Sequence, residues 1–157
     1  MGEITVREFR KTDGEGFLAL GRFLQENGNY KNCGFNPLKV LLLFTYLVEK
    51  NPDYFGVIAE TEEGRIVGAF VGRLENYYFS DEKIASDLCF GLMPGFRDTS
   101  KEVMTEMISR FEQWAIDAGA LEASISPSVG MHGNKLEPFL NETGYTTVGF
   151  STKKRIT

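Results

Sequence analysis

The residues best suited to chemistry lie in a short polar turn between two patterned segments. Before the turn, apolar residues alternate with other residues over positions 84–92, which is the period of a β-strand. After it, apolar residues recur three or four apart over positions 103–115, which is one face of a helix. The free N–H groups at a helix N-terminus commonly hold phosphate. The turn is therefore predicted to be an anion site, with the sequence Arg97-Asp98-Thr99-Ser100-Lys101-Glu102.

The same turn carries negative charge of its own. Thr99 and Glu102 have the spacing of a capping box, in which each side chain bonds a backbone N–H of the turn. Asp98 adds a second carboxylate, and Arg97 and Lys101 offset part of the repulsion that the two acids would exert on a phosphate. The pattern is consistent with an ordinary capped helix and with a weakened anion site.

Asp87 is the best candidate for a general base. In a regular strand it would share a face with Cys89 and Gly91, where a half-buried acid has a raised pKa. A hydrogen-bonded structural aspartate is the alternative. His132 is the only histidine, so a histidine-based triad or multi-histidine metal centre is excluded. Cys33 and Cys89 are too few and too far apart for a metal site.

Length and composition indicate one domain spanning residues 1–157. The chain is 42% apolar and 25% charged, as is usual for a globular protein. A net charge of −5 argues against general nucleic-acid binding. No apolar run is long enough to span a membrane, and no signal peptide is evident, so a cytoplasmic location is expected. The basic cluster Lys153-Lys154-Arg155 is expected to be a solvated strand edge.

Periodicity and capping signals predict the order of elements. Strands are expected at 3–10, 54–60, 65–74, 84–92 and 121–126, with one or two more at 146–156. Helices are expected at 12–28, at 38–50 after the cap Asn36-Pro37, from the polar turn to about Gly119, and at 136–142. The helix at 38–50 is apolar almost all round, so burial within the domain is expected, with partner contact or a deep groove as alternatives.

The polar turn and the order of elements resemble the GNAT N-acetyltransferase superfamily over nearly the whole chain. Leu92-Met93-Pro94 and then Phe96-Arg97 match the start of the family's acetyl-CoA signature. Residues 139–145 look like its late helix followed by a Gly-aromatic pair. Ser100 and Glu102 depart from the signature, because they stand where small residues let the CoA pyrophosphate approach the backbone.

The resemblance implies an α/β (α+β) fold and a cofactor site. The fold would be a mixed, mostly antiparallel twisted sheet with helices on both faces. The strand at 84–92 would be central and would splay from the strand at 121–126, leaving a V-shaped cleft. Acetyl-CoA would be the cofactor, bound weakly or not at all if the acids of the turn prevail. Its predicted contacts are Leu92, Met93 and Asn134 for the pantetheine and Arg97, Asp98, Thr99, Ser100, Lys101 and Glu102 for the pyrophosphate.

The resemblance also assigns catalytic roles. Asp87 aligns with the strand carboxylate that some members use as a base. The tyrosine that usually protonates the departing thiolate is replaced by Leu140, with Tyr145 and Tyr30 as possible substitutes. The loop residue His132 could serve as an acid or base, with an ordinary surface histidine as the alternative. No metal is implied.

Two functions of different classes follow. In the first, the chain is a diverged N-acetyltransferase that acts on an unknown small-molecule or protein amine. In the second, it is a GNAT-fold binding or structural protein that has lost transfer, for example a phage virion-associated one, with a homo-oligomer or another protein as partner. Acceptor specificity would lie in the loops at 27–36 and 76–83, which have no readable code.

Overall fold

A five-stranded sheet forms the centre of the molecule. The computed structural model describes residues 2–96, 100–126 and 135–156. The strands lie side by side in chain order: β1 (Ile4–Glu8), β2 (Tyr54–Thr61), β3 (Ile66–Asn76), β4 (Lys83–Leu92) and β5 (Glu122–Ser124). The first four pair antiparallel, and β4 and β5 pair parallel. The predicted mixed, mostly antiparallel sheet is confirmed, although β3 is the middle strand and β4 lies one place from the edge.

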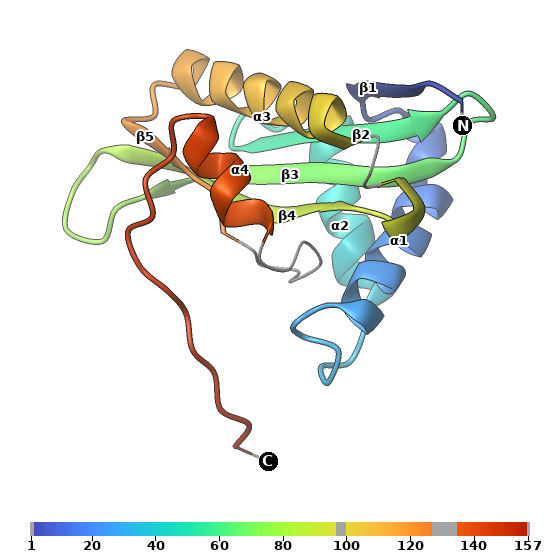
Figure 1. Cartoon of the computed structure of the whole chain (residues 1–157), viewed down its shortest axis with the longest axis horizontal. Helices are drawn as coiled ribbons and strands as arrows, with labels where there is room; N and C mark the ends of the chain where they lie inside the picture. The colour runs from blue at the N-terminus through green and yellow to red at the C-terminus, as the bar shows by residue number, and fades with distance from the viewer. Residues whose placement is uncertain (1, 97–99, 127–134, 157) are drawn as a thin grey trace.

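Helices cover both faces of this sheet, as predicted (Figure 1). One face packs against α1 (Gly14–Asn27) and α2 (Pro37–Val48), and the other against α3 (Ser100–Asp117) and α4 (Leu136–Glu142). Short 3-10 turns precede α1 and α3, at η1 (Lys11–Asp13) and η2 (Pro94–Phe96). Each face has its own hydrophobic cluster, with Leu20 and Ile58 fully buried on the α1 side and Phe70 and Phe111 fully buried on the α3 side.

The start of α1 is fixed by ionic hydrogen bonds. The Arg7 guanidinium donates two bonds to Asp13, at 2.8 and 2.9 Å, and two to Glu60, both at 2.7 Å. Asp13 also accepts the backbone N–H of Arg10 at 2.6 Å. Burial alone would raise the pKa of Asp13, but the bonds from Arg7 and Arg10 outweigh it and lower the pKa. These contacts join β1, β2 and the first turn of α1.

The start of α2 confirms its predicted cap. The Asn36 side-chain oxygen accepts the N–H groups of Leu38 and Lys39, and Pro37 occupies the first helical position. The expected burial of this helix is wrong, however. Leu38 is 75% exposed and Leu42 is 53% exposed, because α2 packs mainly on α1 and reaches the sheet mostly with its C-terminal part.

The strand expected at 146–156 is also not formed. After α4 the chain runs away from the sheet without pairing (Figure 1). Val148 and Phe150 are more than 90% exposed. A two-residue period shows that a segment suits a strand, but a strand also needs an edge to pair with. The basic cluster at 153–155 is therefore not a strand edge, and Lys153 instead contacts the backbone oxygen of Asn29.

No helix in the part of the chain that the structure describes is both long and apolar enough to cross a membrane.

Candidate functional site

β4 is longer than β5 and continues beyond the end of it. Their three paired positions end at Ser86 and Ser124, and β4 continues to Leu92 without this partner. We call the point where this pairing ends, at Ser86 and Ser124, the fork. The predicted splay and V-shaped cleft stay predictions, because residues 127–134 lie outside the described residues.

A β-bulge in β4 lies at the start of the fork. Gly72 of β3 is opposite Asp87, and Val71 is opposite Cys89, so Leu88 is the extra residue on β4. A bulge bends its strand and re-aims the side chains around it. Here it reverses the alternation, so that Ala85 and Phe90 pack into the same cluster on the α3 side.

The bulge separates Asp87 from Cys89. Gly72 faces α3, since a Cβ on it would lie 2.6 Å from Cε2 of Phe111, and Asp87 lies opposite Gly72. Cys89 lies opposite Val71 and packs on the α1 side. The prediction that Asp87 and Cys89 share a face, made for a regular strand, is wrong for this physical reason.

Asp87 closes the base of the fork. Its Oδ1 accepts the backbone N–H of Ser126 at 2.8 Å and the Ser126 hydroxyl at 3.2 Å. The carboxylate thus bridges β4 to the segment after β5. Asp87 is hydrogen-bonded, as the structural alternative required.

The other titratable groups near β4 are poor reactants. Burial raises the pKa of the Cys89 thiol to about 12, and the neighbouring charge of Asp87 adds to the shift. The thiol therefore stays protonated at neutral pH and is a weak nucleophile. Burial, with the Glu112 carboxylate beside it, also raises the pKa of Tyr145. Leu140 is only 7% exposed and packs in the core on the α3 side.

The structure describes only some of the predicted cofactor residues. Leu92 is fully buried at the end of β4, and the Met93 N–H donates to the carbonyl oxygen of Val67 at 2.8 Å. Ser100 begins α3, and Lys101 and Glu102 are exposed in its first turn. The remaining predicted contacts, Arg97, Asp98, Thr99 and Asn134, lie outside the described residues. His132 lies outside them as well.

A cavity of about 310 Å³, which we call the loop cavity, lies between α1 and α2. Tyr30 and Phe35 of the connecting loop line it, with Lys39 from α2 and Cys89 from β4. Gln25 of α1 holds the loop in place by donating to the carbonyl oxygens of Tyr30 and Cys33. The cavity therefore extends from the 27–36 loop, where specificity was predicted, to the residue after the bulge.

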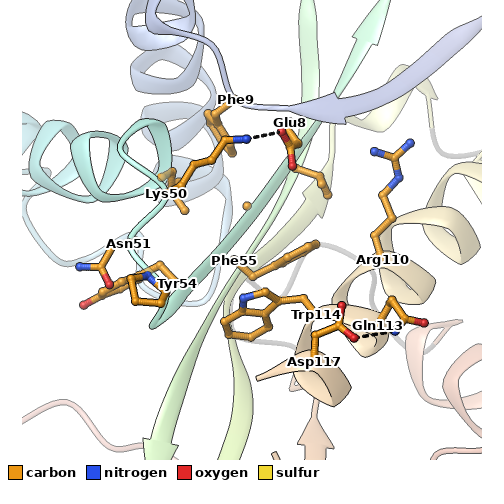
Figure 2. Close-up of a pocket in the computed structure, with 14 residues that line it drawn as sticks. Glu8, Phe9, Lys50, Asn51, Tyr54, Phe55, Arg110, Gln113, Trp114 and Asp117 are labelled. Carbon is orange, nitrogen blue, oxygen red and sulfur yellow. Dashed lines mark hydrogen bonds and ion pairs between the residues drawn. The ribbon is translucent and has the colours of Figure 1, made fainter. Parts of the chain in front are cut away.

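A second cavity of about 480 Å³ lies between the ends of α2 and α3 (Figure 2). Phe55 and Trp114 lie against each other on one side of it, with ring centres 5.6 Å apart. An ion pair of 3.2 Å between Lys50 and Glu8 crosses its rim. None of the residues predicted from the sequence as site residues lines this cavity.

The sequence reasoning missed Ser126, the bulge, the part of the loop cavity contributed by Lys39, and the position of Lys153 over the Tyr30 ring. For the bulge a signal exists, because a glycine inside a strand, here Gly72, often marks one. The partnership of Ser126 with Asp87 joins residues 39 positions apart and has no local signal.

Comparisons with known proteins place this geometry in context. The sequence matches no protein-family model and no curated protein. Glucosamine-6-phosphate N-acetyltransferase from Arabidopsis thaliana has a similar structure, with a TM-score of 0.72, 13% identity and 99% of each chain covered. The aminoglycoside N-acetyltransferase AAC(6′)-Iy was solved with the bisubstrate analogue CoA-S-monomethyl-acetylneamine. It is similar with a TM-score of 0.72 and 15% identity, and 99% of each chain is covered. An acetyltransferase from Trypanosoma brucei gives 0.70 at 12% identity, over 98% of this chain and 100% of its own. The chain therefore has the fold of the GNAT N-acetyltransferase superfamily.

Proposed function

We propose that the protein is an acetyl-CoA-dependent N-acetyltransferase acting on a small-molecule amine. The observation that carries the proposal is the fork, where β4 bulges at Leu88 and its pairing with β5 ends after three residues. Structural neighbours of this fold are solved with CoA and with a CoA bisubstrate analogue. Glucosamine-6-phosphate and aminoglycosides, which the neighbours' names give as substrates, are amines.

The described residues fit acetyl-CoA unevenly. Leu92 and Met93, at the end of β4, are the residues that we assign to contact with the pantetheine arm. The first turn of α3 suits a pyrophosphate less well, because Lys101 is balanced by Glu102. Lys101 also pairs with Glu142 of α4 at 3.3 Å, but both side chains are well exposed and such pairs are weak. Lys101 can therefore turn to a phosphate at little cost.

Asp87 is the residue that we assign to proton removal. When bound, acetyl-CoA would supply the acetyl group as a reactive thioester. The Ser126 hydrogen bonds hold the Asp87 carboxylate at the base of the fork, where it can accept a proton from an amine. Cys89 keeps its proton and serves as part of the cavity wall.

Two observations favour the alternative function, a binding or structural protein that has lost transfer activity. The position of the family's usual proton donor is occupied by the buried, apolar Leu140, and Asp87 is already engaged by Ser126. A GNAT-fold binding protein without transfer activity would show both features.

Release of free CoA thiol from acetyl-CoA distinguishes the two functions. We expect release that depends on an added amine and that Asp87→Asn strongly reduces. A rate that no amine in a broad panel increases above slow hydrolysis would contradict the transferase and support the binding protein.

A further inference from the structure

The loop cavity has charge of one sign only. Among the described residues that line it, Lys39 is the only charged side chain. Two further cations stand at its rim. The Arg22 guanidinium lies 4.5 Å from the centre of the Phe35 ring, and the Lys153 ammonium lies 5.1 Å from the centre of the Tyr30 ring. This local excess is opposite in sign to the net charge of −5 of the whole chain.

The three cations are not neutralised by acids. Lys50, Lys101 and Arg110 elsewhere in the fold each pair with a glutamate. By contrast, no described carboxylate lies within 4.0 Å of the charged nitrogens of Arg22, Lys39 or Lys153. A ring face and the Asn29 carbonyl oxygen orient Lys153 without cancelling its charge.

The uncharged residues that line the cavity do not offset its positive charge. The Asn36 side chain caps the N-terminus of α2. Because Asn36 also lines the cavity, the positive end of the α2 helix dipole lies at the cavity. Gln25 is bonded to the loop backbone. The cavity thus lacks the carboxylates that would bind a polycationic amine, and its charge favours an anion.

We propose that the acceptor amine carries an anionic group, a carboxylate or a phosphate, bound in the loop cavity by Lys39 and Lys153. This inference rests on the proposed N-acetyltransferase function. The anion would occupy the mouth between the loop and the C-terminal segment, and the amine would extend past Cys89, the cavity residue that belongs to β4, to the strand edge at the fork. These positive charges are the reason for proposing an anionic amine as the acceptor. They also give Lys153, in the basic segment at 153–155, a role in binding the anion.

Matched pairs of amines test the proposal by kcat/KM, with CoA thiol release as the readout. The phosphate pair is phosphoethanolamine and ethanolamine, and the carboxylate pair is β-alanine and β-alaninamide. We expect at least a tenfold preference for the anionic member of one pair, and which pair responds identifies the anion. Lys39→Gln combined with Lys153→Gln should abolish the preference, whereas Lys50→Gln, at the other cavity, should retain it. Equal use of both members, or a preference that survives the double substitution, would overturn the proposal.

An NMR titration of the protein with phosphoethanolamine and β-alanine separates this inference from the proposed function. We expect amide shifts confined to residues 21–40, the neighbourhood of residue 89 and the residues around Lys153, and the double substitution should remove them. Such shifts without any turnover of acetyl-CoA would support the anion site and contradict the transferase. Turnover of neutral or polycationic amines alone would contradict the anion site and leave the transferase standing.

Discussion

Asp87 is the residue on which the proposed chemistry depends. Its carboxylate combines a structural bond to Ser126 with a position at the base of the fork. The two roles are separable, because an asparagine keeps a side-chain oxygen for the Ser126 N–H but cannot remove a proton.

We predict that Asp87→Asn lowers kcat by about 10²- to 10⁴-fold, which is the rate enhancement that a general base usually contributes, while the melting temperature changes little. Ser126→Ala is the control, because it removes only the 3.2 Å hydroxyl bond and leaves the backbone bond. Steady-state kinetics and thermal melts of both variants check this. Full activity in Asp87→Asn would exclude Asp87 as the base.

Glu102, one of the predicted pyrophosphate contacts, is the acid in the first turn of α3. We predict that Glu102→Gln tightens acetyl-CoA binding by about two- to fivefold at low salt, because one repulsive charge is removed. The gain should shrink at high salt through screening. Glu106→Gln, one turn further along α3, is the matched control, since Glu106 is paired with Arg110 at 2.7 Å. Calorimetric titration with equal affinities for wild type and Glu102→Gln would show that this charge is not an obstacle.

At the scale of elements, β3 and α3 pack closely at Gly72, which lies beside the bulge in β4. A Cβ on Gly72 would lie 2.6 Å from Cε2 of Phe111 and 3.1 Å from the carbonyl oxygen of Ser86. Phe111 is fully buried, so its ring has no free space to move into.

We predict that Gly72→Ala lowers the free energy of unfolding by about 1–3 kcal/mol, the usual cost of overpacking. Gly34→Ala serves as the control, because a Cβ there meets nothing within 4 Å. Urea denaturation measures both. A Gly72→Ala variant as stable as wild type would mean that α3 can shift away from the sheet at no cost.

The Arg7 cluster makes the joint between β1, β2 and α1 sensitive to acid. The pKa values of Asp13 and Glu60 are lowered in the folded state. A lowered folded pKa gives stability that is present above the unfolded carboxyl pKa of about 4 and is lost as the pH falls through the folded value.

We therefore predict that Asp13→Asn costs roughly 2–3 kcal/mol at neutral pH and flattens the loss of stability below about pH 4. Lys50→Ala should cost less than about 1 kcal/mol, because its pair with Glu8 is 75% and 70% exposed. Denaturation across a pH series decides this, and an unchanged acid profile in Asp13→Asn would contradict the assignment.

At the scale of the whole molecule, local patterns predicted the elements and long-range contacts decided the site. The cap at Asn36 and the helix at 136–142 were predictable because both depend on adjacent residues. The exposure of Leu38 was not, because it depends on where α2 docks. The bulge at Leu88 and the bond from Ser126 to Asp87 depend on other strands and loops, so strict alternation misplaced Asp87.

The unpaired segment after α4 shows the same limit. Its alternating pattern suits a strand, yet in this chain it passes the 27–36 loop, where Lys153 contacts Tyr30. The sequence states what a segment is able to form, and the available partner decides whether it forms.

Hydrogen–deuterium exchange with and without saturating acetyl-CoA tests the proposed cofactor site most directly. We predict slower exchange of the amides at 87–93 and in the first turn of α3, next to the fork. The amides at 54–57 and 113–117, around the second cavity, should be unchanged. Protection confined to the second cavity, or no protection at ligand concentrations in the millimolar range, would contradict binding of acetyl-CoA at the fork.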